Sequence, residues 1–506
     1  MKKIRSVLVA NRGEIAIRVF RACNELGIRT IAIYSKEDSL SLHRFRADES
    51  YLVGEGKKPV DAYLDIEDII RIAHEHDVDA IHPGYGFLSE NADLAKRCEE
   101  EGIIFIGPKV EHLIMFGDKI NARIQAKKAG IQYIPGSDGP VMNYAEVEKF
   151  AKQVGFPIML KAVNGGGGRG MRMVDRMADL RDAYDRAKSE AKLAFGSDEI
   201  YLEKCIVNPK HVEVQIMGDE HGNVIHLFDR ECSVQRRNQK VVEESPSPFL
   251  TLELRREMGE KAVAAAKAVN YSGAGTIEFL VDKNRDFYFL EMNTRLQVEH
   301  PITEEVVGVD LVKEQIRIAN NEVLHLKQEE LFQRGHAIEC RICAEDTENN
   351  FMPSPGIIKQ LTEPNGIGVR IDSYVYEGYE IPIYYDPMIG KLIVWATTRQ
   401  YAIERMRRVL YEYKITGLKT NLSYLKRIMH TPDFVKGEYN TLFIEKNSRM
   451  LLRGNGNNEE IENIAMIASY IDYLMNLEEN KSPQLSDARP ISRWREFGLQ
   501  KGVLRI

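Results

Sequence analysis

The sequence of 506 residues contains no apolar run near the length of a membrane-spanning helix, which needs about 18 to 20 residues. Its first residues, MKKIRSVLVANRGEI, are basic but reach only four successive apolar residues before Asn11, so we expect no signal peptide. The lack of both features predicts a protein that has no membrane contact and works in the cytoplasm.

Cysteine is scarce and scattered, with six residues at positions 23, 98, 205, 232, 340 and 343. Cys340 and Cys343 form a CxxC pair inside the apparent strand HAIECRICA, but no second pair completes a zinc site. We therefore expect ordinary reduced thiols, which agrees with a cytoplasmic location.

An excess of basic residues is also missing, because the net charge is −7. A general nucleic-acid binder shows a basic surplus overall or in one domain, and the run QRRNQK at 235–240 is too short to supply it. A hydrophobic content of 43% and a charged content of 29% describe a soluble globular chain. Its length allows about three domains.

The first hundred residues alternate between strand and helix patterns. Strands are predicted at 4–10, 27–35, 79–83 and 103–107, and helices at 14–26 and 66–76. This alternation predicts a parallel sheet flanked by helices. The turn after the first strand, Asn11 to Glu14, lacks the GxGxxG pattern of dinucleotide sites, so nothing indicates NAD.

The loop HPGYGFLSEN at 82–91 has two interpretations. It contains two glycines and follows a strand, where open α/β sheets bind ligands. A plain turn with a helix cap at Ser89, Glu90 or Asn91 explains it nearly as well.

A glycine-rich loop, NGGGGRG at 164–170, lies between the predicted strands FPIMLKA and MRMVD and follows a predicted helix at 144–154. Gly165, Gly167 and Gly170 satisfy GxGxxG, but a strand follows where a dinucleotide motif has a helix. The Gly-Lys-Ser/Thr of a P-loop is absent. Because four successive glycines are costly to order, we interpret the loop as a mobile flap that closes over phosphates beside Lys161.

Further strands are predicted in YLEKCI, HVEVQIMGD and LFDRECSVQRRNQKVVEE, the last as one strand, and helices at 116–128 and 252–269. Glu203 is a candidate for contacting an adenine edge, although an ordinary strand end explains it equally well. Arg236, Arg237 and Lys240 resemble a surface cluster. They lie between two candidate phosphate elements, so we favour anion binding.

The segment DFYFLEMNTRLQVEHPITE, 286–304, carries polar residues at every second position of a strand, on one face. These are Glu291, Asn293, Arg295, Gln297 and Glu299. A hairpin with GAGTIEFLV, closed at Asn284-Arg285, places Glu278 opposite Glu291. Glu278, Glu291 and Asn293 then offer oxygen ligands suited to Mg²⁺. The alternative is a charged strand face exposed to water.

After Gly335 the pattern becomes α+β, with strands in HAIECRICAED, GVRIDSYV and GKLIVWAT and a helix at 400–413. A polar linker, RGNGNNEE, follows Ser448. Beyond it, apolar residues at helical spacing form a stripe that we expect to dock on this chain or on a partner subunit: Ile461, Ile464, Ala468, Ile471 and Met475.

Nine segments resemble, in the same order, the biotin carboxylases of the ATP-grasp superfamily: GEIAIR, IHPGYGFLSEN, GDK at 117–119, KAVNGGGGRGMR, QRRNQKVVEE, GTIEF, EMNTRLQVEHPITE, HAIECRICAED and YYDPMIGKLI. The resemblance covers residues 1 to about 446. It implies an α/β and α+β fold in four parts: a Rossmann-like N-terminal domain at 1–112, an ATP-grasp centre at 113–334 with a mobile lid at about 133–203, a mixed α+β C-terminal domain at 335–446, and a linker with a helical extension at 447–506.

The resemblance also implies roles for single residues. The nucleotide contacts would be Lys119, Lys161, Gly166, Gly167, Glu203, Lys204, Ile206 and His211. Glu278, Glu291 and Asn293 would hold Mg²⁺ or Mn²⁺. The bicarbonate site would comprise Lys240, Arg295, Gln297, Val298 and Glu299, with Glu299 as base, and Arg341 would stabilise the biotin oxyanion.

The implied reaction is ATP- and bicarbonate-dependent carboxylation of biotin on a carrier protein, through carboxyphosphate. Joining bicarbonate to the γ-phosphoryl group brings two anions together, so cations must neutralise charge where it develops. The resemblance implies a homodimer that works with a biotin carboxyl carrier protein and a carboxyltransferase subunit. The companion reaction would be that of an acetyl-CoA, acyl-CoA or pyruvate carboxylase.

Two positions depart from the family pattern. Asn238 stands where many members have a histidine that contacts nucleotide, and Asn164 replaces one glycine at the edge of the flap. Asparagine can hydrogen-bond but carries no charge, which bears on nucleotide affinity. The alternatives are another ATP-grasp ligase, of the carbamoyl-phosphate or purine-carboxylating kind, and a silent scaffold that binds nucleotide and subunits.

Overall fold

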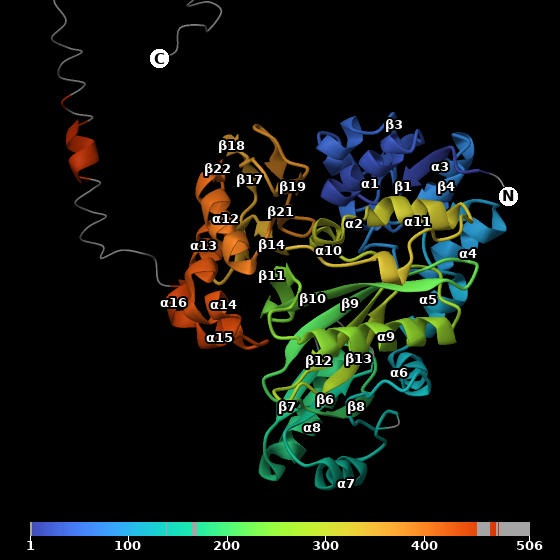
Figure 1. Ribbon diagram of the computed structural model, residues 1–506, viewed down its shortest axis with the longest axis vertical. Coiled ribbons are helices and arrows are strands. Elements are labelled where there is room, and N and C mark those ends of the chain that lie inside the picture. The colour runs from blue at the N-terminus through green and yellow to red at the C-terminus, as the bar shows by residue number, and fades with distance from the viewer. Residues whose placement is uncertain (1–2, 138, 164–169, 453–465, 472–473, 475–506) are drawn as a thin grey trace, which may run out of the picture. The chain divides into compact units, whose positions relative to one another are not determined.

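The computed structural model describes residues 3–137, 139–163, 170–452, 466–471 and 474 (Figure 1). The chain divides into two compact units, 1–452 and 453–506. In the second unit residues 466–471 are helical and exposed, and they include Ala468 and Ile471 of the predicted stripe. Ile461, Ile464 and Met475 lie outside the described residues, so the docking of this stripe stays a prediction.

The N-terminal part forms the predicted parallel sheet, in the order β3-β2-β1-β4-β5. Its strands are β1 (Ser6–Val9), β2 (Arg29–Tyr34), β3 (Glu49–Leu52), β4 (Ala80–His82) and β5 (Ile104–Phe105). Alternate residues of β1 face opposite sides. Val7 and Val9 therefore pack with α1 (Gly13–Glu25), while Leu8 packs with α3 (Ile66–Glu75) and α4 (Ala92–Glu100). A short helix, α2 (Pro59–Tyr63), precedes α3.

An antiparallel sheet of eight strands forms the centre, in the order β13-β12-β9-β10-β11-β14-β21-β19. The strands are β9 (Lys210–Gly218), β10 (Val224–Arg236), β11 (Gln239–Ser245), β12 (Gly273–Val281), β13 (Phe287–Asn293), β14 (His336–Cys343), β19 (Val369–Ser373) and β21 (Met388–Ala396). The pairing of β11 with β14 carries this sheet across residue 334, where the predicted ATP-grasp centre ends.

Three strands, in the order β7-β6-β8, form a separate small sheet at the bottom of Figure 1. They are β6 (Ile158–Ala162), β7 (Met171–Val174) and β8 (Ile200–Lys204), and α7 (Tyr144–Val154) and α8 (Met177–Phe195) pack against them. The antiparallel pairing of β6 with β7 confirms the predicted hairpin around the glycine-rich loop. Gly166 and Gly167 of that loop lie outside the described residues.

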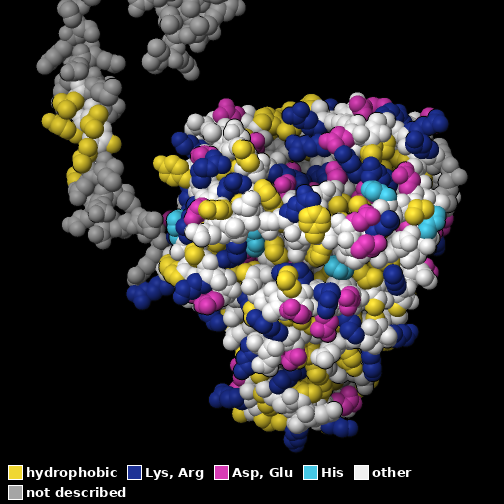
Figure 2. All heavy atoms as spheres, in the orientation of Figure 1, with side chains coloured by type: hydrophobic (Ala, Val, Ile, Leu, Met, Phe, Trp, Pro, Cys, Tyr) yellow, Lys and Arg dark blue, Asp and Glu magenta, His cyan; other side chains and the backbone are white. Residues whose placement is uncertain are grey.

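The remaining elements surround the central sheet (Figure 1). The helices are α5 (Val110–Gly117), α6 (Lys119–Lys128), α9 (Leu252–Ala268), α10 (His300–Val307), α11 (Leu311–Ala319), α12 (Arg399–Glu412), α13 (Leu422–His430), α14 (Pro432–Lys436), α15 (Phe443–Lys446) and α16 (Ser448–Leu452). The short strands are β15 (Glu345–Asp346), β16 (Met352–Pro353), β17 (Gly356–Ile357), β18 (Gln360–Thr362), β20 (Glu380–Ile381) and β22 (Lys414–Thr416). Basic and acidic side chains are interspersed over the face in Figure 2.

The structure corrects two predicted elements. The helix expected at 116–128 is interrupted at Asp118, whose backbone is extended and whose Oδ1 accepts a hydrogen bond from Asn121 N at 3.2 Å. This side chain therefore begins α6 as an N-cap would. The strand expected in LFDRECSVQRRNQKVVEE is two strands, β10 and β11, because Arg237 and Asn238 form a two-residue turn with φ of 50° and 65°.

A third correction concerns the strand that carries the predicted catalytic residues. Strand β13 ends at Asn293, although the alternating pattern predicted a strand that continues through Arg295 and Gln297. Residues 294–299 form a loop, and helix α10 follows directly. Pro301 lies in the first turn of α10, where its fixed φ suits a helix start. The predicted bicarbonate residues Arg295, Gln297, Val298 and Glu299 thus lie on a loop rather than on a strand face.

Candidate active site

The β12–β13 hairpin places Glu278 directly opposite Glu291, as predicted. The predicted two-residue closure at Asn284-Arg285 was wrong. Asp282 N bonds to Asp286 O at 2.9 Å, and Arg285 adopts a φ of 72°, which makes a three-residue loop. A bulge between Glu278 and Phe279 offsets the extra loop residue, so the expected pairing survives.

Lys240 lies at the centre of a cluster of buried carboxylates. Its Nζ lies 2.6 Å from Glu213 Oε2, 3.0 Å from Glu278 Oε1 and 2.5 Å from Glu299 Oε1. The three acids come from β9, β12 and the residue that precedes α10, and Lys240 is the second residue of β11. The fold therefore brings one amine and three carboxyl groups together.

Glu299 connects this cluster to Arg341 on β14. Its Oε1 faces Lys240, and its Oε2 accepts a hydrogen bond from Arg341 Nη2 at 3.0 Å. Arg341 Nε also donates to Glu243 Oε1 at 2.6 Å. Sequence reasoning placed Lys240, Glu299 and Arg341 in one site, and the structure brings them into direct contact.

Burial and charge act against each other on these acids. Burial raises the pKa of Glu299, but Lys240 and Arg341 outweigh it and hold that pKa well below its usual range. The pKa of Glu278 is also lowered, because Lys240 and His211 overcome burial. Burial dominates at Glu243 and raises its pKa to about 7, although Arg341 opposes the shift. Glu299 and Glu278 are therefore anionic at neutral pH.

Two of the three predicted metal ligands, Glu278 and Asn293, lie close enough together to share a divalent cation. Glu278 and Asn293 are buried and adjacent, with Asn293 Nδ2 3.1 Å from Glu278 Oε1. His211 Nε2 lies 2.9 Å from Glu278 Oε2, and ligand atoms of His211, Glu213 and Glu278 lie within 4.8 Å of one another. Glu291 lies across the hairpin on an exposed position. Oxygen donors of this kind suit Mg²⁺ or Mn²⁺.

Arg295 is held by a residue that we considered only as a possible helix cap. Its Nε donates to Glu90 Oε2 at 3.0 Å, and Glu90 Oε1 also accepts from the Thr294 backbone at 3.2 Å. Arg295 Nη1 lies 3.3 Å from Gln297 Oε1. The cap of α4 is Asn91, whose side chain accepts from Leu94 N. The loop 82–91 therefore caps a helix, as one interpretation predicted, and also contacts Arg295 through Glu90.

The predicted nucleotide contacts lie along the small sheet and its connections. Lys161 forms an ion pair with Glu203, whose Oε1 also lies 2.7 Å from Arg123 Nη2. Lys204 Nζ donates to Gly155 O at 3.0 Å and to Phe156 O at 2.8 Å. Glu203 thus has two cationic partners, Lys161 and Arg123.

Three further positions predicted to contact nucleotide lie on other elements of the chain. Lys119 begins α6, Ile206 is half-buried after β8, and Asn238 is exposed in its turn. Gln297, which was predicted to bind bicarbonate, is buried beside Glu278, with its Nε2 3.4 Å from Glu278 Oε1. Asn238 holds a positive φ of 65°, which asparagine tolerates well.

Sequence reasoning missed three buried charged residues of the site. Glu213 contacts Lys240, Glu243 contacts Arg341, and Arg230 donates to Glu213 Oε1 at 2.5 Å. No local pattern singles them out, because polar residues such as His211, Gln215 and Glu244 lie on the same strands.

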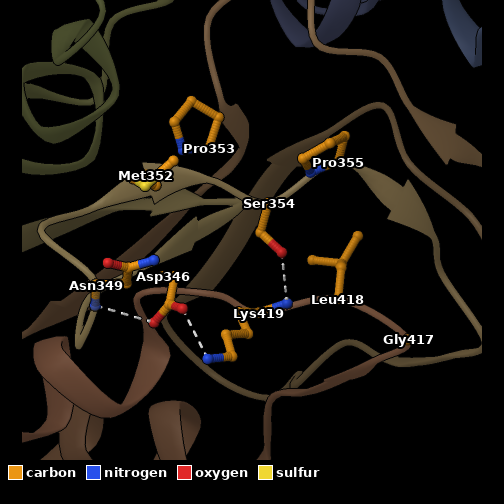
Figure 3. A pocket seen from close by; sticks show the side chains of 9 residues that line it. All are labelled: Asp346, Asn349, Met352, Pro353, Ser354, Pro355, Gly417, Leu418 and Lys419. Atoms are coloured by element: carbon orange, nitrogen blue, oxygen red, sulfur yellow. Dashed lines mark hydrogen bonds and ion pairs between the residues drawn. The ribbon is translucent and has the colours of Figure 1, made fainter.

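A separate hollow of about 590 Å³ lies in the C-terminal part (Figure 3). It is lined by Asp346, Asn349, Met352, Pro353, Ser354, Pro355, Gly417, Leu418 and Lys419. Lys419 Nζ donates to Asp346 Oδ2 at 2.7 Å across it. All of the predicted site residues lie outside these nine.

All six cysteines are free thiols, as expected. Within the described ranges no helix has both the length and the apolar character that a bilayer crossing requires.

Family models match most of the chain. "Biotin carboxylase, N-terminal domain" matches residues 3–113, "Carbamoyl-phosphate synthase L chain, ATP binding domain" matches 118–327, and "Biotin carboxylase C-terminal domain" matches 339–446.

Relatives and solved structures agree with these matches. A biotin carboxylase from Nostoc sp. is 52% identical, and the match covers 88% of this chain and 99% of that protein. A pyruvate carboxylase from Bacillus subtilis is 57% identical over 88% of this chain, but the chain spans only 39% of that protein. A similar solved structure is the biotin carboxylase domain dimer of a Hydrogenobacter thermophilus 2-oxoglutarate carboxylase, in complex with MgADP and bicarbonate. It superposes with a TM-score of 0.86 and is 48% identical in sequence, and the match covers 90% of this chain and 100% of that one. The chain belongs to the biotin carboxylase family.

Proposed function

We propose that this protein catalyses ATP- and bicarbonate-dependent carboxylation of biotin carried on a partner protein. The observation that carries the proposal is the position of Glu299 between Lys240 and Arg341, beside the carboxylate of Glu278. A base, two cations and a candidate metal ligand therefore meet within one buried cluster. The solved relative described above binds MgADP and bicarbonate, which supports the same substrates here.

The ion pairs of Glu299 define what must happen before it can act as a base. A carboxylate whose pKa is held well below its usual range is a weak proton acceptor. When bicarbonate enters, Lys240 can turn from Glu299 to the new anion. Losing a cationic partner raises the pKa of Glu299, so binding of the substrate itself prepares the base that deprotonates it.

The charges of the other site residues suggest their roles in the proposed reaction. Arg295, oriented by Glu90, would bind bicarbonate together with Lys240 and Gln297 and the backbone at Val298. Deprotonated bicarbonate attacks the γ-phosphoryl group, and carboxyphosphate and ADP form. Carboxyphosphate releases CO₂ and phosphate, the phosphate takes the biotin N1 proton, and Arg341 stabilises the oxyanion while N1 attacks CO₂.

Nucleotide and metal would lie between the small sheet and the hairpin. Lys119, Lys161, Gly166, Gly167, Glu203, Lys204, Ile206, His211 and Asn238 would contact ATP. A divalent cation held by Glu278, Glu291 and Asn293 would neutralise phosphate charge. We propose the domain limits 1–112, 113–334, 335–446 and 447–506, with the lid at about 133–203.

The chain spans 39% of the length of the pyruvate carboxylases from Bacillus subtilis and Staphylococcus aureus. We propose a cytoplasmic homodimer that works with a biotin carboxyl carrier protein and a carboxyltransferase subunit. Light scattering tests the dimer, and a monomeric mass would contradict it.

Bicarbonate-dependent ADP release tests the activity. We expect release to rise when free biotin or biotinylated carrier is added, with transfer of ¹⁴C from bicarbonate to biotin. If neither addition stimulates release, or if ammonia or an aminoimidazole stimulates it instead, the assignment is wrong.

A further inference from the structure

Two neighbouring cations of the central sheet hold two successive residues of the 294–299 loop. Arg341 on β14 and Lys391 on β21 are direct cross-strand partners, so their side chains leave the sheet on the same face. Arg341 Nη2 donates to the Glu299 side chain at 3.0 Å, and Lys391 Nζ donates to the Val298 backbone carbonyl at 3.0 Å. The sheet thus contacts both the side chain of the base and the backbone before it.

Lys391 is completely buried and links distant segments of the chain. Its Nζ lies 3.2 Å from Glu14 Oε1 on α1 and 4.0 Å from Asp372 Oδ2 on β19. A buried ammonium group is costly unless acids and hydrogen-bond acceptors surround it. The N-terminal part, the C-terminal part and the loop therefore meet at one lysine.

The contact with Val298 constrains the loop more than a side-chain contact would. A trans peptide unit is planar, so its C=O and the following N–H point in opposite directions. Fixing the Val298 carbonyl therefore fixes the direction of the Glu299 N–H. Glu299 is the N-cap residue of α10, and residues 294–299 lie between a strand and a helix, where regular structure does not set their backbone.

We propose that Lys391 is a positioning residue for biotin carboxylation, which holds the Val298 carbonyl and so orients Glu299 and the adjacent backbone toward bicarbonate. The inference rests on the proposed function. Lys391 contacts the loop from the side of the sheet, and its effect reaches the substrate through Val298 and Glu299.

Steady-state kinetics of Lys391→Met and Lys391→Gln test this. Methionine removes the donor and the charge, whereas glutamine keeps an N–H donor. We expect Lys391→Met to raise KM for bicarbonate by about tenfold or more, equivalent to about 1.4 kcal/mol, and to leave KM for ATP within about twofold. We expect Lys391→Gln to recover part of the loss, because a donor to Val298 remains.

Lys210→Met is a matched control, since Lys210 is also buried and donates to a backbone carbonyl, that of Tyr439. We expect it to lower Tm without changing KM for bicarbonate. Equal changes in KM for both substrates in the Lys391 variants, or an unchanged KM for bicarbonate in a folded variant, would overturn the inference.

Two further variants keep the test decisive if Lys391→Met does not fold. The double variant Lys391→Met, Glu14→Gln removes both members of the buried pair and should show the same KM increase. Glu14→Gln alone keeps the bond to Val298, so KM for bicarbonate should stay within about twofold; a tenfold rise would show that the ion pair, not the bond to Val298, matters. A wild-type protein without biotin-stimulated ADP release would refute the proposed function instead.

Discussion

The ammonium group of Lys240 lies 2.5 Å from the carboxylate of Glu299. The cation that should attract bicarbonate is therefore already paired with the base that should deprotonate it. Under the proposed function bicarbonate would compete with Glu299 for Lys240, so part of its binding free energy would be used to separate this pair.

Glu299→Gln should separate chemistry from binding. The neutral amide cannot accept a proton, so we expect the rate of carboxybiotin formation to fall by at least about 100-fold, within the range for loss of a general base. Because glutamine competes less for Lys240, bicarbonate affinity should be retained or improved. Single-turnover ¹⁴C transfer and ¹³C NMR line broadening of bicarbonate measure the two effects. Retained turnover would show that another group is the base.

Glu278→Gln should weaken metal binding. We expect the affinity for Mn²⁺ in the presence of ADP to fall by about 10- to 100-fold, as when metal coordination is perturbed. Electron paramagnetic resonance of free Mn²⁺ gives the affinity. Glu257→Gln, on an exposed position of α9, is the control and should bind Mn²⁺ like the wild type. Equal affinities in all three proteins would place the metal elsewhere.

Glu14 makes stability fall as pH rises. Burial raises its pKa to about 7, although Lys391 opposes the shift. The folded state therefore keeps a proton that the unfolded state has lost above about pH 4.3. The contribution of Glu14 to the free energy of unfolding is fully present below that pH. It then declines by up to about 1.4 kcal/mol per pH unit until the pH passes about 7.

The test is to measure the urea midpoints of the wild type and of Glu14→Gln from about pH 4.5 to about pH 8, which is roughly the range over which the decline occurs. We expect the variant to lose less stability than the wild type over the interval. Parallel pH profiles would show that Glu14 is ionised throughout in the folded protein.

Asn238 should matter for the β10–β11 turn. Its φ is 65°, which costs a β-branched residue roughly 1–2 kcal/mol. We expect Asn238→Val to lower the free energy of unfolding by about that amount and Asn238→Gly to change it by a few tenths of a kcal/mol. Urea denaturation gives both values. Equal stability of the two variants would mean that the turn adopts another conformation in solution.

Glu90→Ala should loosen Arg295. Glu90 is partly exposed, so the ion pair is screened by water, and we expect KM for bicarbonate to rise about two- to fivefold. The comparison is Glu99→Ala, an exposed residue of α4, which should leave KM unchanged. An unaltered KM in Glu90→Ala would show that Arg295 keeps its orientation through Asn293 and Gln297 alone.

The sequence predicted the parallel sheet, the two hairpins and the meeting of Lys240, Glu299 and Arg341. These features depend on local patterns or on the family resemblance. The pairing of Glu278 with Glu291 was also correct, but two errors offset each other there, since the turn is one residue longer and a bulge restores the register.

The missed features depend on contacts between distant segments. The end of β13 at Asn293 follows from polar loop residues that find partners elsewhere, such as Thr294 with Glu90, 204 residues apart in sequence. Similarly, Glu213 and Glu243 look like ordinary strand residues until the sheet places them beside Lys240 and Arg341. Local alternation cannot distinguish a solvated charge from one buried with a partner.

The central sheet also determines how this protein can be divided. A cut after residue 334 would separate β11 from β14 and leave two unpaired strand edges with apolar residues, including Val242 and Ile338. Exposed edges of this kind pair with other chains and lead to aggregation. It would also remove Arg341 and Lys391 from Glu299 and Val298. The ATP-grasp segment can therefore be recognised in the sequence but does not form a separate folding unit. The smallest piece that can be expressed in active form must extend beyond β21.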